Sequence, residues 1–421
     1  MNPQPTIAAD DSTERAWAAA DSVARTSYGK LVAFLAMRTR DVSAAEDALS
    51  EAFATALADW PKGGCPRNPE AWLLTVARRK LIDNCRGAQR REALTSELSL
   101  IEEALLTPFA DEIPDERLAM IFACAHPSID AGVRAPLILQ TVLGLDAKRI
   151  ASAFLTSPAA MGKRLVRAKE KIRQAGIPFR VPAREELPAR LGAVLDAIYA
   201  AFAEGWTDPA GADAARRDLA EEALFLARLV TVLLPAEPEA LGLLALLLHA
   251  EGRRRARRSP GGEFVPLAEQ DQALWDATQI AEAEALLHRA GALGNIGRFQ
   301  LEAAVQSAHV DRCRNGTANW SHVVGLYDGL FALTGSPVVL LNRALAIAEF
   351  EGPQAGLASL PSAADDLRLN EYQPYWAARA DLLARNGESA EARLALEIAI
   401  GLERDPAVRR FLEQRRAALQ D

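Results

Sequence analysis

Cysteine and histidine are scarce in this chain, and their spacing argues against the usual metal and disulfide sites. The four cysteines, Cys65, Cys85, Cys124 and Cys313, form no C-x-x-C pair, and the five histidines show no metal-ligand spacing. Widely separated cysteines favour a reducing compartment over a disulfide framework. We therefore expect no metal and no other cofactor.

Targeting signals and long apolar runs are lacking as well. The first residues, M-N-P-Q-P-T-I-A-A-D-D, contain no basic stretch followed by an apolar one, so no secretory signal is expected. The most apolar run, Leu241–Leu248, is far too short to cross a bilayer. The sequence thus predicts a cytoplasmic protein that contacts no membrane.

Catalytic motifs are also missing from the sequence. Gly29-Lys30 and Gly162-Lys163 lack the upstream glycine and the following Ser or Thr of a phosphate-binding loop. The chain has no H-E-x-x-H segment and no nucleophile elbow. We therefore expect a protein that is not an enzyme.

Charge is distributed unevenly along the chain, whose formal net charge is −8. Residues 1–180 carry 24 Lys+Arg and 22 Asp+Glu, a net of +2, whereas residues 181–421 carry 24 and 34, a net of −10. The first half is therefore expected to meet polyanions, and the second half is expected to repel them.

Composition and periodicity predict an all-α fold. Ala, Leu, Glu and Arg dominate, and no convincing run of alternating β-branched residues occurs. A chain of 421 residues is expected to hold two or three domains. Proline, glycine and charge divide it into a helical unit at 11–91, an acidic linker at 92–114, a second helical unit at 115–180 and paired helices at 185–421. The stretch from Glu92 to Glu116 holds eight acidic and no basic residues, either as a solvated loop or as a shield for the basic units.

The first helical unit contains two helices with polar outer faces. S-A-A-E (Ser43–Glu46) fits a capping box at the start of the first one. Its predicted inner face holds Ala45, Leu49, Ala52, Phe53 and Ala56, and its outer face holds Asp47 and Glu51. Solvated acids on an ordinary amphipathic helix would also explain this pattern.

Asn68-Pro69 marks the start of the second of these helices. The predicted buried stripe is Leu74, Ala77, Leu81 and Cys85, and the opposite face holds Trp72, Thr75, Arg79, Asp83 and Arg86. An aromatic ring among cations suits contact with phosphates and stacking on a splayed base. Packing of Trp72 on a neighbouring helix, with solvated cations at Arg78, Arg79 and Lys80, is the alternative.

The second helical unit contains a helix-turn-helix pattern at Ile150–Ala168, with Ile150, Ala151 and Phe154 buried in its first helix. Ser157 is expected to cap the second helix and Pro158 to occupy its first position. The inner face is Met161, Leu165, Ala168 and Ile172, and the outer face is Ala160, Lys163, Arg164, Arg167 and Lys171. The residues nearest the helix start suit base edges, and the later cations suit phosphates. A basic surface helix in a bundle is the alternative.

In order and separation, the two units resemble regions two and four of bacterial RNA polymerase sigma factors, most closely the small extracytoplasmic-function type. A-E-D-A-L-S-E-A-F (Ala45–Phe53) resembles the family's D-A-E-D-L-V-Q-E-T-F helix, which docks on the clamp helices of the polymerase largest subunit. P-E-A-W-L-L-T-V-A-R-R-K-L-I-D (Pro69–Asp83) resembles R-A-W-L-x-x-I-A-R-N-x-x-x-D, which opens and reads the −10 element. The helix-turn-helix resembles the unit that reads the −35 element.

The remaining length resembles a subgroup with a tetratricopeptide-like C-terminal extension. I-F-A-C-A-H-P-S-I (Ile121–Ile129), L-A-E-Q-D-Q-A-L-W-D (Leu267–Asp276) and N-R-A-L-A-I-A-E-F-E-G-P-Q-A-G-L (Asn342–Leu357) are similar to its members. The residues Trp320, Val323, Val324 and Tyr327 keep the spacing that starts a tetratricopeptide repeat. Such stacks form concave surfaces that bind peptides or other domains.

The resemblance implies three sets of contact residues. The set for the −10 element is Trp72, Arg78, Arg79, Lys80, Asp83, Asn84 and Arg86. The set for the −35 element is Ser157, Ala160, Lys163, Arg164, Arg167 and Lys171. The set for core polymerase is Glu46, Asp47, Leu49, Glu51 and Phe53. The chain departs from the family at Leu49-Ser50-Glu51, and Ala159-Ala160 offers few base-reading side chains, which leaves the −35 sequence undefined.

The sequence therefore predicts a sigma factor whose partners are bacterial core RNA polymerase and promoter DNA. Its C-terminal region would gate this activity through an intramolecular or protein partner. Two alternatives stay open: a polymerase-independent helix-turn-helix regulator on a palindromic operator, and a tetratricopeptide scaffold without salt-dependent DNA contact. Arg253–Arg258 resembles a nucleic-acid patch, but an internal ion-pairing surface or a contact with the acidic linker explains it at least as well.

Overall fold

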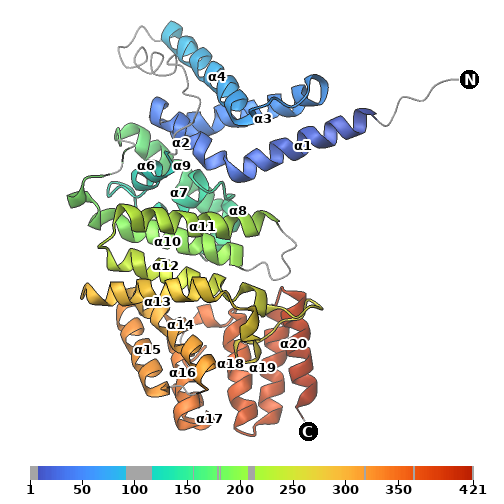
Figure 1. Ribbon diagram of the computed structural model, residues 1–421, viewed down its shortest axis with the longest axis vertical. Helices are drawn as coiled ribbons and strands as arrows, with labels where there is room; N and C mark the ends of the chain where they lie inside the picture. Colours follow the sequence, from blue (N-terminus) through green and yellow to red (C-terminus); the bar gives the residue numbers. More distant parts are fainter. Residues whose placement is uncertain are drawn as a thin grey trace, which may run out of the picture. The chain divides into compact units, whose positions relative to one another are not determined.

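The computed structural model describes residues 8–91, 116–154, 156–177, 180, 182–206, 214–316, 319–363 and 366–419 (Figure 1). Within these ranges the chain is helical with no strand beyond an isolated bridge between Arg258 and Phe264. The predicted all-α fold is confirmed. The chain forms two compact units, the first comprising 1–206 and 214–226 and the second comprising 207–213 and 227–421.

The first unit contains two groups of helices, followed by α10 and most of α11. The first group is α1 (Ala8–Thr26), α2 (Tyr28–Thr39), α3 (Val42–Gly63) and α4 (Pro69–Arg91). The second group is α6 (Arg117–Cys124), α7 (Ala131–Thr141), α8 (Ala147–Ala153) and α9 (Pro158–Gln174), followed by α10 (Pro188–Trp206) and α11 (Ala214–Leu233). The predicted linker at 92–114 lies outside the described residues.

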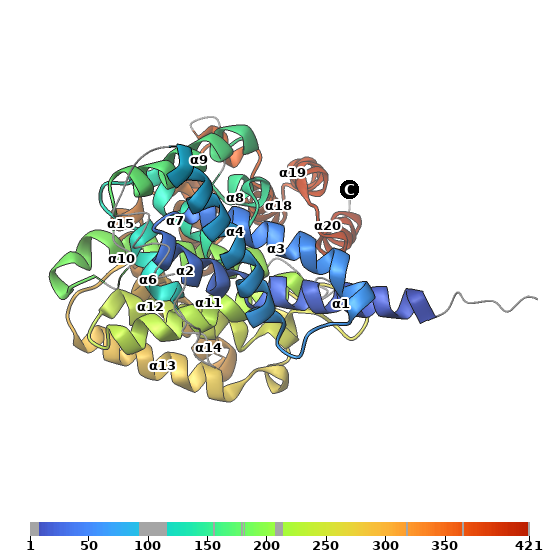
Figure 2. The ribbon, with the colours of Figure 1, turned by 90° about the horizontal axis from the view of Figure 1, so that it is seen from above.

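The centre of this unit is α2, whose residues 31–36, L-V-A-F-L-A, are all buried. Six consecutive apolar residues surround the helix on every side, so one layer of neighbours could not cover them. α3 and α4 pack on α2 from its own group, and α6 and α7 pack on it from the other group (Figure 2). The two groups therefore share one hydrophobic core.

The start of α3 differs from the predicted capping box. Asp41 is the cap, and its side chain accepts a hydrogen bond from the Ala44 amide at 3.0 Å. Ser43 lies one residue inside the helix and is exposed, so the predicted cap at Ser43 was wrong. Asp and Ser are comparably good caps, and the sequence pattern alone did not separate them.

α10 packs on α7 and α6, although residues from 185 onward were predicted to belong to a separate C-terminal region. The Arg190 guanidinium is buried there, donating to the Phe122 carbonyl at 3.2 Å and to Glu186 at 3.0 Å. Arg117 of α6 pairs in turn with Glu222 of α11. The start of the C-terminal sequence thus completes the first unit.

The second unit is a succession of helices in which most contacts join neighbours in sequence. After short 3-10 turns its helices are α12 (Pro238–Glu251), α13 (Ala277–Ala292), α14 (Arg298–Asn315), α15 (Trp320–Thr334), α16 (Pro337–Glu351), α17 (Pro353–Ser359), α18 (Gln373–Arg385), α19 (Ser389–Leu402) and α20 (Pro406–Ala418). Gly352 has φ 99° between α16 and α17, and Gly387 has φ 85° between α18 and α19. These positive angles favour glycine at both turns.

Most arginines of the run Arg253–Arg258 are buried or half-buried in the second unit, and Arg255 is exposed. The buried Arg253 donates to the His249 carbonyl at 2.9 Å, Arg254 pairs with Glu251 at 2.8 Å, and Arg258 pairs with Asp405. For Arg253, Arg254 and Arg258, these contacts favour the ion-pairing interpretation over the nucleic-acid patch.

Candidate nucleic-acid interface

α4 presents a polar face opposite its buried stripe. The Asn68 side chain caps the helix by accepting from the Ala71 amide at 3.0 Å. Leu73, Leu74, Ala77 and Leu81 are buried, whereas Thr75, Arg79, Lys80, Asp83 and Asn84 are exposed. This confirms the predicted division of the helix at Leu74, Ala77 and Leu81 on the buried side and at Thr75, Arg79 and Asp83 on the exposed side. The side chains of Cys85 and Arg86 lie outside the described part of the chain.

Trp72 is half-buried beside the end of α3. Its ring meets the buried ring of Trp60 edge to face, with the centroids 5.4 Å apart and an interplanar angle of 67°. Such pairs add to packing stability beyond their buried area. Trp72 therefore helps to fix α4 against α3, and its side chain is not fully covered.

The cations of α4 have different surroundings. Arg79 is exposed and Arg78 is half-buried. The Lys80 ammonium lies 3.0 Å from Glu51 of α3, and both side chains are about half exposed. An exposed pair of this kind contributes little stability, so a phosphate could replace Glu51 as the partner of Lys80.

α3 carries the five candidate polymerase contacts in three environments. Asp47 and Glu51 are exposed, Phe53 and Glu46 are partly buried, and Leu49 is fully buried. Leu49 lies in the core together with the rest of the helix's apolar stripe. In this conformation the Leu49 side chain packs in the core and offers no surface to a partner. The resemblance had implied that Leu49 contacts core polymerase.

α8 and α9 form the predicted helix-turn-helix. The Ser157 hydroxyl accepts from the Ala160 amide at 3.3 Å, and Pro158 opens α9. Ile150 and Ala151 are buried and Phe154 is half-buried; Met161, Leu165, Ala168 and Ile172 are all buried. The outer face is exposed at Ala160, Lys163, Arg164, Arg167 and Lys171.

Two residues of α9 were not singled out from the sequence. Val166 is 69% exposed among the cations of the outer face. Lys169 lies at the edge between the inner and outer faces, and its ammonium lies 2.5 Å from the Glu46 carboxylate of α3. The sequence could have indicated Val166, because it is an apolar residue on the predicted outer face. No neighbouring residue in the sequence indicated that Lys169 would pair with Glu46.

The contact between α9 and α3 is largely buried. The Lys169 and Glu46 side chains are only 9% and 16% exposed, and Arg173 of α9 lies 3.9 Å from Asp41. Burial raises the pKa of the Glu46 carboxyl above its usual range, and the Lys169 ammonium offsets this only in part. The carboxylate oxygen Oε1 of Glu46 is buried and accepts no hydrogen bond from the described residues.

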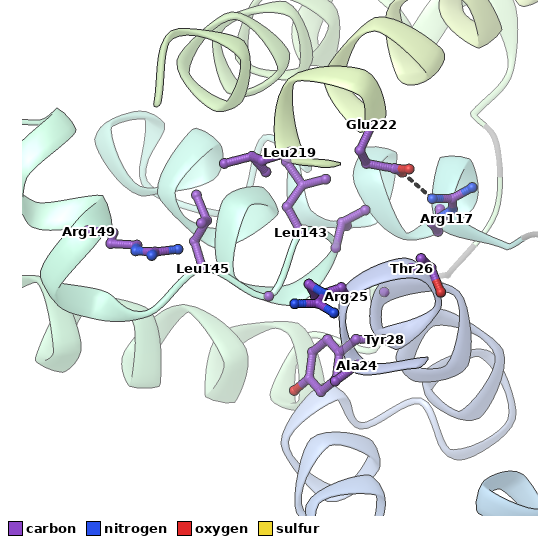
Figure 3. Close-up of a pocket in the computed structure, with 13 residues that line it drawn as sticks. Ala24, Arg25, Thr26, Tyr28, Arg117, Leu143, Leu145, Arg149, Leu219 and Glu222 are labelled. Atoms are coloured by element: carbon purple, nitrogen blue, oxygen red, sulfur yellow. Dashed lines mark hydrogen bonds and ion pairs between the residues drawn. The ribbon is translucent and has the colours of Figure 1, made fainter. Parts of the chain in front are cut away.

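A cavity of about 290 Å³ lies within the first unit, between the α1–α2 corner and the segment that follows α7. Figure 3 shows Arg25 and Tyr28 from the α1–α2 corner on one side, and Leu143, Leu145 and Arg149 on another. The paired Arg117 and Glu222, with Leu219, complete the lining. The packing between the two helix groups is therefore interrupted at this point.

Comparison with known proteins identifies the first group of helices. Residues 24–91 match the family described as Sigma-70 region 2, which supports a role in transcription initiation through core RNA polymerase and promoter DNA. Residues 190–291 match a family of unknown function. No solved structure matches the chain.

The chain as a whole belongs to the same family as an uncharacterized protein, R00370, of Rhizobium meliloti (strain 1021). The two are 39% identical over 369 residues, which cover 86% of this chain and 87% of that protein. The described residues contain neither a helix long and apolar enough to cross a membrane nor a cluster of residues suited to hold a metal ion.

Proposed function

We propose that this protein is a sigma factor of the extracytoplasmic-function type that acts in the cytoplasm and directs core polymerase to promoters through two separate DNA contacts. The observation that carries the proposal is the occurrence of a region 2 match and a basic helix-turn-helix in one chain. An autonomous operator-binding protein has no need of region 2, so this alternative is not favoured.

On region 2, the −10 contact would use the polar face of α4. Arg79 and Asn84 are exposed there, and Lys80 needs only to exchange Glu51 for a phosphate. Trp72 lies at the start of the same helix, and its side chain is not fully covered. Stacking on an aromatic ring holds an unpaired base, and neighbouring cations hold its phosphates. Core polymerase would bind the exposed acids of α3, Asp47 and Glu51.

On the α6–α9 domain, the −35 contact would use α9 as a recognition helix. Lys163 and Arg164 lie near its start, where side chains reach base edges. Arg167 and Lys171 follow on the exposed face and suit phosphates. Ala160 and Val166 add apolar surface of the kind that contacts thymine methyl groups. The motif would then read a mixture of guanine and thymine positions.

The C-terminal unit would regulate initiation. Its consecutive helices pack mainly on their sequence neighbours, as in tetratricopeptide-like stacks, and its sequence is acidic where the DNA-binding half is basic. A domain with this charge repels DNA. We infer that it binds a protein partner or another part of this chain and thereby gates the sigma activity.

The test is transcription from a library of promoter fragments by purified bacterial core polymerase, with and without the full-length protein. We expect start sites that appear only with the protein. Arg79→Ala should reduce their yield roughly tenfold, as loss of one charge-assisted contact does, while Arg410→Ala, an exposed arginine of α20, should leave it unchanged. Absence of start sites, combined with tight binding to DNA without polymerase, would instead support the operator-binding alternative.

A further inference from the structure

We propose that the cavity beside the α1–α2 corner binds a small organic molecule that joins an oxyanion, either a phosphate or a carboxylate, to an apolar body. The cavity measures about 290 Å³, which is at the lower end of the size range of small-molecule sites. This inference goes beyond the proposed function and does not depend on it. The residues that line the cavity belong to none of the three sets that we assign to promoter DNA and core polymerase.

The walls of the cavity are rich in arginine. Arg25, Arg117 and Arg149 line it, and Glu222 is the one acidic residue among the described residues of its lining. Arg117 is buried and pairs with Glu222, so its charge is matched within the wall. The planar donor group of arginine fits the oxygens of a phosphate or a carboxylate in a bidentate manner. The excess of arginine over acid therefore favours an anionic ligand.

Arg25 is the arginine whose present partner is most easily exchanged. It pairs with Asp21 of α1 at 2.5 Å, but the two side chains are 36% and 57% exposed. An exposed pair of this kind contributes little stability. An oxyanion in the cavity could therefore replace Asp21 at Arg25 and meet the half-buried Arg149 from the other side.

The remaining wall is largely apolar. Val142, Leu145 and Leu219 are buried, and Leu143 is half-buried. Figure 3 shows the three leucines between Arg149 on one side and Arg25 and Arg117 on the other. A cavity with charged groups in its wall holds water, whereas cavities that stay empty are apolar. A ligand with an apolar body would displace that water from the leucines, and its oxyanion would bind the arginines.

Three separate segments build this site. The α1–α2 corner belongs to region 2, Arg117 and Arg149 belong to α6 and α8, and Leu219 and Glu222 belong to α11. α11 lies within the segment 190–291, whose family has no known function. The site gives that segment a role as one wall of a ligand pocket. It also connects a small anion with the half of the chain that carries the proposed DNA contacts.

Calorimetric titration of the full-length protein with four probes tests the proposal. Phenyl phosphate and benzoate each join an oxyanion to an apolar ring, whereas inorganic phosphate supplies only the oxyanion and phenol only the ring. We expect phenyl phosphate or benzoate to bind with a Kd below about 1 mM, and at least about tenfold more tightly than inorganic phosphate or phenol. The tighter of the two identifies the oxyanion. The same probe should raise the melting temperature, because it binds the folded state alone.

Charge variants test whether the probe binds in this cavity. Arg149→Ala should weaken the binding of the tighter probe about tenfold, because a charge-assisted hydrogen bond is lost. Lys148→Ala removes the same charge from the preceding residue of α8, which is exposed and does not line the cavity. This matched variant should leave the affinity unchanged.

Glu222→Gln should bind the probe more tightly than the wild type. The change removes the acid from the wall and releases Arg117 for the ligand, so the affinity should rise about fivefold. Glu221→Gln makes the same change at an exposed residue of α11 outside the cavity and should have no effect. Damage to the fold cannot raise the affinity, so Glu222→Gln decides the question if Arg149→Ala fails to fold.

Absence of binding by phenyl phosphate and benzoate up to about 10 mM would overturn the proposal. Equal affinities of the wild type, Arg149→Ala and Glu222→Gln would overturn it as well. Binding of phenol as tight as that of phenyl phosphate and benzoate would show an apolar cavity without an anion site, and this too would contradict the proposal. None of these measurements uses polymerase or DNA, so failure of the ligand site and failure of the proposed function are distinguishable.

Discussion

Asp41 determines where α3 begins. Ser43, two residues further along the chain, provides a matched comparison for the effect of removing a cap. Replacing Asp41 by Ala removes the side chain that accepts from the Ala44 amide and should lower the free energy of unfolding by about 1 kcal/mol. Ser43→Ala, at the position where the sequence predicted the cap, should change the free energy of unfolding by less than about 0.5 kcal/mol. Chemical denaturation of the two variants measures the difference. Equal losses would mean that both side chains cap the helix.

His249 makes the stability of the second unit depend on pH. Its ring is fully buried, and burial together with Arg253 lowers its pKa from 6.5 to about 4. The unfolded chain therefore binds more protons below about pH 6.5, so stability falls as the pH falls toward 4. At pH 5 the loss is about 2 kcal/mol. His249→Gln, which does not titrate, should show a shallower decline in melting temperature between pH 7 and 5, and an unchanged slope would contradict the assignment.

At the scale of elements, the proposed −35 contact of α9 predicts different effects for base-reading and phosphate-binding residues. Arg164→Ala should change the preferred −35 sequence, with a loss of about 1–3 kcal/mol at the position it reads. Lys171→Ala should weaken binding to all promoters alike and reduce the slope of binding against salt concentration by about 1. Binding of the polymerase complex to promoter variants at several salt concentrations measures both. Equal loss on all sequences for Arg164→Ala would exclude a base contact.

α10 stabilises the α6–α9 domain through one buried arginine. Arg190→Ala leaves the Phe122 carbonyl without its donor and Glu186 without its nearest buried partner. We expect a loss of about 2–3 kcal/mol in the free energy of unfolding. Arg180 is an exposed partner of the same Glu186, so Arg180→Ala should lose less than about 0.5 kcal/mol. Denaturation curves of the two variants test this, and similar losses would refute the role of α10.

Sequence periodicity was sufficient to place the helices of the proposed DNA contacts. The proline and cap residues that start α4 and α9 determine the helix start through neighbouring residues in the sequence. Asn68 and Ser157 could therefore be identified from the sequence alone, as could the apolar spacing of both helices. The ion pair of Lys169 with Glu46 joins residues 123 positions apart, and no local pattern encodes such a pair. The burial of Leu49, the edge contact of Trp72 and the packing of α10 likewise depend on which helices meet in space.

At the scale of the whole molecule, the limits of the first compact unit decide which fragments can be studied. A fragment ending at 184 removes α10 and the start of α11, which pack on α6 and α7 or pair with Arg117. A fragment ending at 226 keeps them. We expect the longer fragment to melt at a clearly higher temperature in circular dichroism. Equal melting temperatures would show that α10 contributes nothing to the first unit.

The ion pair between Arg258 and Asp405 joins residues 147 positions apart, and Phe264 meets Phe411 of α20 nearby with ring centroids 5.4 Å apart. In an ordinary row of helical repeats each repeat contacts only its neighbours, so the terminal helix frays first and unfolding proceeds in steps. Here α20 and its cap residue Asp405 contact Arg258 and Phe264, which lie near the beginning of the second unit. This long-range closure raises the contact order, which slows folding, and it should make the entire unit unfold in a single cooperative transition.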